Sequence, residues 1–435
     1  MESHDAIDPD QIRRRIEVRI GQGEFLAGML HVARRTSADT QESFVGRLCN
    51  IATAVRAILD LNGCIKRLDY RPQQFWPSIK GQAIAFLDGG VANIDLPSAA
   101  PVGIRVGSYI VRPGETDPGF REQFNIELSI VDDLYANDGE LYDNDFLDVA
   151  KLRDAARIIS ETAAVWRLAS GENPPDFVLL HGPLVNPAAP YGLDGFPAYG
   201  LEACQIFLGD SSWSPDDDQR QFVGLYLELL DRIKAAGRTT IGVVERSIGK
   251  DPVVTRYLLN SLQDAGKMKK GEAKRLLDQI LLYGLNDATL FDVVLQEGEF
   301  LAPVSVMRQG PENKWPDAWK ERIRAYPNAL TTYLKPSETT LPFRVEAFDT
   351  VSNLDRALDL VLHTSRLLPS YGFPVGLDIV DKFAKVPDWM SRSVRGQHQV
   401  VLLQKALASG DPRALTFAKR VLAAKGRDWF FRPSA

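Results

Sequence analysis

The order of the predicted strands and helices after residue 80 constrains the fold of this chain more than any other feature. Three segments rich in β-branched and aromatic residues, separated by Gly and Pro, predict three successive strands, which we expect to be antiparallel. A helical pattern over about 146–169 follows, and a buried strand over 176–184 comes next. The three strand segments read GQAIAFLD, VGIRVGSYIVRPG and QFNIELSIVDDL.

Beyond this point strands and helices alternate. A helix that ends at Gly237 precedes a strand over 239–247, and two later strands, LTTYLK and FRVEAF, come before a run of helical patterns. Periodicity alone leaves the α/β and α+β classes open. Three strands, a helix and then alternation is the order of a ribonuclease-H-like mixed sheet, so we predict an α/β fold with flanking helices. The segment 185–218 matches neither pattern and predicts a long functional or mobile loop.

The composition sets limits on the partners of this protein. Its 435 residues carry a net charge of −6, so it is not a basic nucleic-acid coat, although a local groove of Lys and Arg can still bind phosphates. Its three cysteines share no CxxC spacing, which fits a reducing cytosol. The charged first residues do not resemble a signal peptide, and no apolar run approaches about 18 residues. We therefore expect a soluble, cytoplasmic protein without a membrane span.

Asp88 is the first candidate for chemistry, because it ends the apolar strand AIAFLD. A divalent metal ion needs hard oxygen ligands at fixed positions, and a rigid strand supplies one. Gly89 and Gly90 follow at once, and residues without side chains would let a phosphate backbone approach closely. The alternative is ordinary turn chemistry, since Asp-Gly is a common hairpin signal.

Three further residues could join Asp88. Glu161 lies in the predicted helix, where its alternative is a solvated acid. His181 ends the strand DFVLLH, a position that suits a metal ligand, a general base or a hydrogen-bonded turn residue. Asp381 lies on a helix that begins after Pro374, beside an apolar face, and its alternative is an exposed helical acid.

Cations near the last two strands could bind phosphates. Lys335 and Arg344 lie at strand ends, and Glu346 is a candidate salt-bridge partner for either, which is the alternative role for both. The chain lacks a Walker A loop, a Rossmann glycine fingerprint, HExxH, GxSxG and zinc-like Cys/His clusters. These absences argue against an NTPase, a dehydrogenase, a zincin and a typical esterase.

The order of these motifs resembles that of the NurA family of DNA-end-processing nucleases. The resemblance covers about 80–390, and six motifs occur in the family's order. The family's first strand ends in an acid followed by Gly, and a helical glutamate comes next. Next comes a strand ending Asp-Gly-x-Leu, followed by a GVV strand. The set ends with a YLK-like strand, an xRxE strand, and a Tyr-x-Pro turn before a helix that bears Ala-His. The matching segments here read AFLDGG, LLHGPL, TIGVVERS, TTYLK, FRVE and YGFPVGLDIVDKFA.

Three departures from the family pattern stand out. His181 occupies the position of the family's Asp in Asp-Gly-x-Leu, and Asp381 occupies that of the family's helical His. The two changes are reciprocal, so a shared site would keep its ligand types while their positions exchange. Glu245 stands where the family tends to carry Lys, which removes a charge that would bind phosphate.

The resemblance implies metal-assisted phosphodiester hydrolysis with Mn²⁺ or Mg²⁺ as cofactor and DNA as substrate. It further implies a homodimer and a ring-shaped, hexameric HerA-type ATPase that feeds DNA to the nuclease in end processing or defence. We expect an N-terminal helical extension (1–78), a NurA-like nuclease domain (79–390) and a C-terminal helical tail (391–435). The expected catalytic and metal-binding residues are Asp88, Glu161, His181 and Asp381, and the expected DNA contacts are Lys335, Arg344, Lys382 and Tyr371.

Two other functions stay open at this point. A non-catalytic DNA-binding or adaptor subunit would keep the fold and the groove but bind metal poorly, and the changes at His181 and Glu245 favour it. An unrelated α/β enzyme remains if the motif order is coincidence. Metal-dependent degradation of DNA by the purified chain separates the nuclease from the adaptor.

Overall fold

A computed structural model describes most of the chain, and residues 424–435 of the predicted tail lie outside the described part. The described residues are 10, 11, 13–15, 17, 24–92, 102–132, 149–192, 196–216, 218–245, 251–307, 309, 317–351, 353–368 and 371–423.

In this described part, ten strands form one sheet. They are β1 (Ile65–Arg67), β2 (Ile84–Ala92), β3 (Val102–Val111), β4 (Glu122–Asp132), β5 (Phe177–His181), β6 (Thr239–Val244), β7 (Glu299–Leu301), β8 (Val304–Val306), β9 (Ala329–Leu334) and β10 (Phe343–Phe348). Their order across the sheet is β1-β7-β9-β10-β6-β5-β2-β3-β4, and β8 pairs with β9.

The sheet is mixed, as the sequence predicted. β2, β3 and β4 pair antiparallel, whereas β5 pairs parallel with both β2 and β6. β10, β9, β7 and β1 continue the sheet with antiparallel pairing. The short strands β1, β7 and β8 were not predicted, because three residues are too few to show an alternating pattern.

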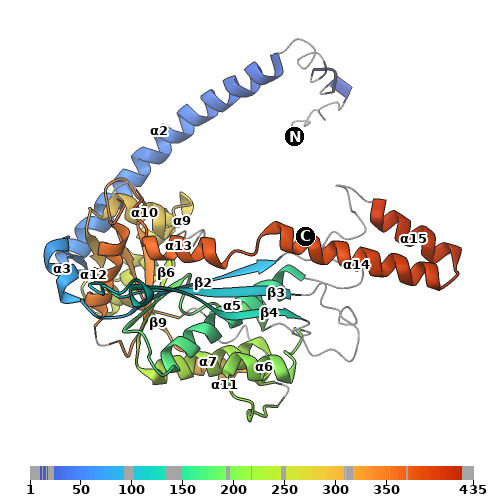
Figure 1. Ribbon diagram of the computed structural model, residues 1–435. Coiled ribbons are helices and arrows are strands. Elements are labelled where there is room, and N and C mark those ends of the chain that lie inside the picture. The colour runs from blue at the N-terminus through green and yellow to red at the C-terminus, as the bar shows by residue number, and fades with distance from the viewer. Residues whose placement is uncertain are drawn as a thin grey trace.

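Helices cover both faces of this sheet (Figure 1). The longer ones before β7 are α2 (Glu24–Leu61), α5 (Val149–Ser170), α6 (Leu201–Leu208), α7 (Phe222–Ala236), α8 (Val253–Asp264), α9 (Glu272–Leu282) and α10 (Asp287–Val294). Those after β8 are α11 (Asp317–Ala325), α12 (Leu354–Ser365), α13 (Val375–Ala384), α14 (Asp388–Ala408) and α15 (Pro412–Ala423). Short turns complete the set: α3 (Pro72–Ser78), α4 (Pro118–Arg121) and the 3₁₀ helix η1 (Ala189–Tyr191).

Alternation along β2 divides its side chains between two cores. Ala85 and Leu87 pack with α5, α6 and α7 on one face. Ile84 and Phe86 pack with α12 and α13 on the other face. Because successive side chains of a strand point to opposite faces, Asp88 belongs to the α13 side and Gly89 to the α5 side. A third core lies among α2, α8, α9 and α10.

The prediction that 185–218 forms one long loop is wrong. The segment contains η1 and α6, and Cys204 and Phe207 of α6 are fully buried. Gly209, with φ of +65°, ends this helix in the left-handed conformation. Eight residues between Gly-rich turns give too short a pattern for a helix to be recognised from the sequence.

The two glycines after Asp88 have a different role from the one expected. A Cβ on Gly89 would lie 2.7 Å from Cγ and Oε1 of Glu161, and one on Gly90 would lie 2.5 Å from the carbonyl oxygen of Ala384. The protein's own α5 side chain and the end of α13 therefore fill the room that we expected a phosphate backbone to use. The glycines let two helices approach β2 from opposite faces.

Within the described residues, no helix combines the length and apolar character that crossing a membrane requires.

Gly90→Ala should destabilise the protein by about 1–3 kcal/mol, because the new methyl group would overlap backbone atoms that cannot rotate away. Gly396→Ala is the matched control, since no heavy atom lies within 4 Å of a Cβ at that position of α14 and Ala favours helix by about 1 kcal/mol. Urea unfolding midpoints measure both effects. A Gly90→Ala protein as stable as the wild type would contradict this packing.

Candidate metal centre

Asp88 lies in the middle of β2, which continues past it to Ala92, so the prediction that Asp88 ends its strand is wrong. The residue is held from two sides. Its side chain is almost buried, with 7% of the residue's surface exposed. The backbone N–H of Gly89 donates to Oδ1 at 2.8 Å, and Oδ2 lies 3.0 Å from Nδ1 of His181. Both carboxylate oxygens are therefore fixed in direction.

His181 reaches Asp88 because β5 runs parallel to β2. The register pairs Leu180 with Leu87, so the next residue on each strand is a polar one. Burial opposes protonation of the imidazole, but the hydrogen bond to Asp88 and the negative charges of Asp88, Asp381 and Glu245 together raise the pKa of His181. The site is thus strongly attractive to positive charge.

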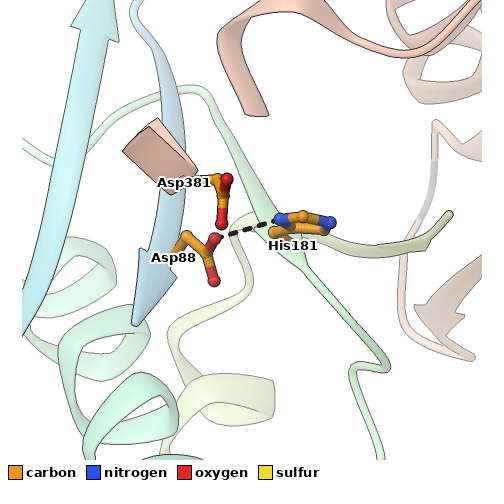
Figure 2. A group of neighbouring side chains, drawn as sticks. All are labelled: Asp88, His181 and Asp381. Carbon is orange, nitrogen blue, oxygen red and sulfur yellow. Dashed lines mark hydrogen bonds and ion pairs between the residues drawn. The ribbon is translucent and has the colours of Figure 1, made fainter. Parts of the chain in front are cut away.

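Asp381 completes the group from the last turn of α13. This helix lies directly on β2, where a Cβ on Gly376 would come within 2.4 Å of the Phe86 ring. Ligand atoms of Asp88, His181 and Asp381 all lie within 4.8 Å of one another, and Figure 2 shows the three side chains converging from β2, β5 and α13. Two carboxylates and one imidazole at this spacing can hold a divalent metal ion.

Glu161, the fourth predicted member, lies next to this group but not in it. It reaches Gly89 from α5 and is 4% exposed. Nη1 of Arg157 donates to both of its oxygens, at 2.8 and 3.0 Å. Burial raises the pKa of Glu161, the charge of Arg157 opposes that effect, and the charge of Asp88 adds to it. The carboxylate is thus buried and already has a cation.

Other charged groups surround the three side chains on the α13 side. Nζ of Lys385 lies 2.5 Å from Oδ2 of Asp381. Lys382 and Tyr371, two of the predicted DNA contacts, share one partner: Lys382 lies 2.5 Å from Oδ2 of Asp378, and Tyr371 hydrogen bonds to the same carboxylate. Burial, this hydrogen bond and nearby acids raise the pKa of Tyr371.

The other two predicted DNA contacts lie elsewhere. Lys335 is buried, and its Nζ donates to the backbone oxygen of Asp292 at 2.6 Å. Arg344 pairs with Glu346, with Nε and Oε1 2.9 Å apart. Its neighbours Phe343 and Val345 belong to the core on the α13 side, so Arg344 faces the opposite side from Asp88. The phosphate-binding role of both residues stays a prediction.

Two residues that touch this site were missed in the sequence. Arg157 precedes Glu161 by four positions, and Lys385 follows Asp381 by four. Residues at that spacing lie on the same face of a helix, so the spacing itself indicates that each acid pairs with its cation. The signal is weak, because such pairs are common on solvated helices.

A model of the NurA domain matches residues 82–386, which is more than half of the chain. The chain belongs to the NurA family. None of the curated proteins compared with it matches.

Solved structures of NurA proteins and of human ENDOV are similar to this chain at low sequence identity. The NurA nuclease from Sulfolobus solfataricus is 14% identical, with 85% of this chain and 98% of that one covered and a TM-score of 0.42. A structure of NurA with manganese is 12% identical, with coverages of 84% and 98% and a TM-score of 0.37. Human ENDOV is 14% identical, with coverages of 78% and 97% and a TM-score of 0.29.

The reciprocal change against the NurA pattern falls within one site. His181 and Asp381 both belong to the three-residue group around Asp88, although 200 residues of sequence separate them. The group therefore retains an Asp and a His while the strand and the helix exchange them. The role of these residues as metal ligands stays a prediction.

Proposed function

We propose that this NurA-family protein is a metal-dependent deoxyribonuclease whose ion is held by Asp88, His181 and Asp381. The convergence of these three side chains is the observation that carries the proposal. They come from two adjacent parallel strands and a helix that packs on them, so the backbone fixes the position of each. Rigid elements of this kind hold a site more precisely than loops do.

The donor set fits Mn²⁺ and Mg²⁺ to different degrees. Carboxylate oxygens suit both ions, whereas an imidazole nitrogen is less suited to Mg²⁺, which prefers oxygen ligands. With one imidazole among three ligands, we propose Mn²⁺ as the better cofactor. The negative charge that raises the pKa of His181 also attracts a divalent cation to this position.

The roles of the chain's own residues follow from their contacts. A bound divalent ion supplies a nucleophile from water at neutral pH and stabilises charge on the leaving oxygen. The N–H of Gly89 keeps the Asp88 carboxylate oriented, so that one of its oxygens always faces His181. Lys382 and Tyr371 lie on the same side of the sheet and would contact DNA phosphates. Lys385 would leave Asp381 when the ion binds and become free to pair with a phosphate.

DNA is the substrate, and we propose a homodimer that works with a HerA-type hexameric ATPase in end processing or defence. Membership of the NurA family supports this assignment. The chain carries no Walker A motif, so energy for moving DNA would come from such a partner.

A DNA-binding or adaptor subunit is the second candidate. Two observations favour it: Glu245 adds negative charge near His181, and Lys385 already pairs with Asp381. Glu245 would disfavour an anionic DNA backbone at the site, and Lys385 would compete with a metal ion for Asp381. Activity of the purified chain distinguishes the two functions.

Asp88→Asn should reduce Mn²⁺-dependent cleavage of single- and double-stranded DNA by at least about 100-fold, because it removes a ligand charge while keeping the side-chain shape. Asp117→Asn is the matched control, since Asp117 caps the short helix α4 at the surface and Asn caps equally well. Cleavage is followed on labelled oligonucleotides, and circular dichroism verifies folding. Equal activity of Asp88→Asn and the wild type would rule out this site.

The exchange of His181 and Asp381 should appear as coupling in a double-mutant cycle. His181→Asp alone puts three carboxylates together, which repel one another, and Asp381→His alone leaves a single carboxylate. The double variant restores the ligand types and should recover Mn²⁺ affinity that each single variant loses, with a coupling of about 0.5–3 kcal/mol. Calorimetric titration measures the affinities. Strictly additive losses would show that the two residues do not share a metal.

A further inference from the structure

Arg157 is the most completely held cation near the candidate metal centre. Its Nη1 donates to both oxygens of Glu161, and its Nη2 donates to Asp154 at 2.8 Å. Asp154 in turn accepts a short hydrogen bond from the hydroxyl of Tyr191. The guanidinium is therefore fixed between two carboxylates, one of which is itself anchored.

Glu161 is confined on the side that faces the metal centre. It packs against Gly89, the residue directly after Asp88, from the opposite face of β2. Its carboxylate interacts electrostatically with both Asp88 and His181. A buried carboxylate so close to other acids needs a compensating cation, and Arg157 supplies one that stays charged at any physiological pH.

We propose that Arg157 takes the place of a second metal ion, so that the site binds a single divalent ion through Asp88, His181 and Asp381. Glu161 then does not ligate the ion. This inference rests on the proposed metal-dependent function and specifies its metal stoichiometry. In two-metal nucleases the ions lie about 3.5–4 Å apart and share carboxylates. Here the carboxylate available for sharing is already neutralised by a guanidinium.

Arg157 is thus a positioning residue. Loss of charge should have different consequences at the two buried acids, Asp88 and Glu161. Removing the charge of Asp88 removes a ligand of the single ion. Removing the charge of Glu161 leaves all three ligands in place. Removing the charge of Arg157 leaves a buried carboxyl group beside Asp88 without its cation, and at a pH that ionises Glu161 a second divalent cation can neutralise it.

Calorimetric titration of the full-length chain with Mn²⁺, together with electron paramagnetic resonance of the bound ion, tests the stoichiometry. We expect one Mn²⁺ per wild-type chain with the spectrum of an isolated ion. Glu161→Gln should bind one ion with an affinity within about threefold of the wild type, whereas Asp88→Asn should lose at least about 100-fold. In titrations at a pH that ionises Glu161, Arg157→Met should bind two ions, whose mutual coupling broadens the spectrum.

The double variant Arg157→Met/Glu161→Gln is the matched control, because it removes both buried charges together. It should again bind one ion per chain. If Arg157→Met does not fold, the titrations of the wild type and of Glu161→Gln are sufficient to test the metal stoichiometry. Two ions bound by the wild type would overturn the inference, as would a loss in Glu161→Gln as large as that in Asp88→Asn. No Mn²⁺ binding by the wild type would instead refute the proposed metal-dependent function itself.

Discussion

The parallel pairing of β5 with β2 is the constraint on which the candidate site depends. It places the middle of β2 beside the end of β5, so that Asp88 and His181 follow matched apolar residues and meet at 3.0 Å. The helix α13 can then add Asp381 because it packs along the same face of β2 (Figure 2). A slip of one residue in this register would turn one of the two strand residues to the opposite face.

Close approach from both faces of β2 is the second requirement, and two adjacent glycines meet it. Gly90 admits the end of α13, which carries Asp381, and Gly89 admits Glu161 from α5. The site is therefore built across a strand instead of in a loop. The same geometry separates the candidate residues: Asp88, His181 and Asp381 lie on the α13 side, while Glu161 remains with Arg157 on the other.

Much of this arrangement was predictable from the sequence. The order of the strands along the chain and the mixed sheet followed from the residue patterns, and Asp88, His181 and Asp381 were selected because apolar segments precede or surround them and because of the family resemblance. The pairing of Glu161 with Arg157 was not predicted, because a spacing of four residues on a helix does not say whether the pair is buried. The burial of Lys335 was missed for the same reason, since it depends on Asp292, a partner distant in sequence.

A crystal structure of the protein soaked with Mn²⁺, with anomalous scattering recorded at the manganese edge, tests the central claim most directly. We expect one anomalous peak in contact with Asp88, His181 and Asp381, and Arg157 still paired with Glu161. A peak in contact with Glu161, a pair of peaks, or manganese bound only elsewhere on the chain would contradict it.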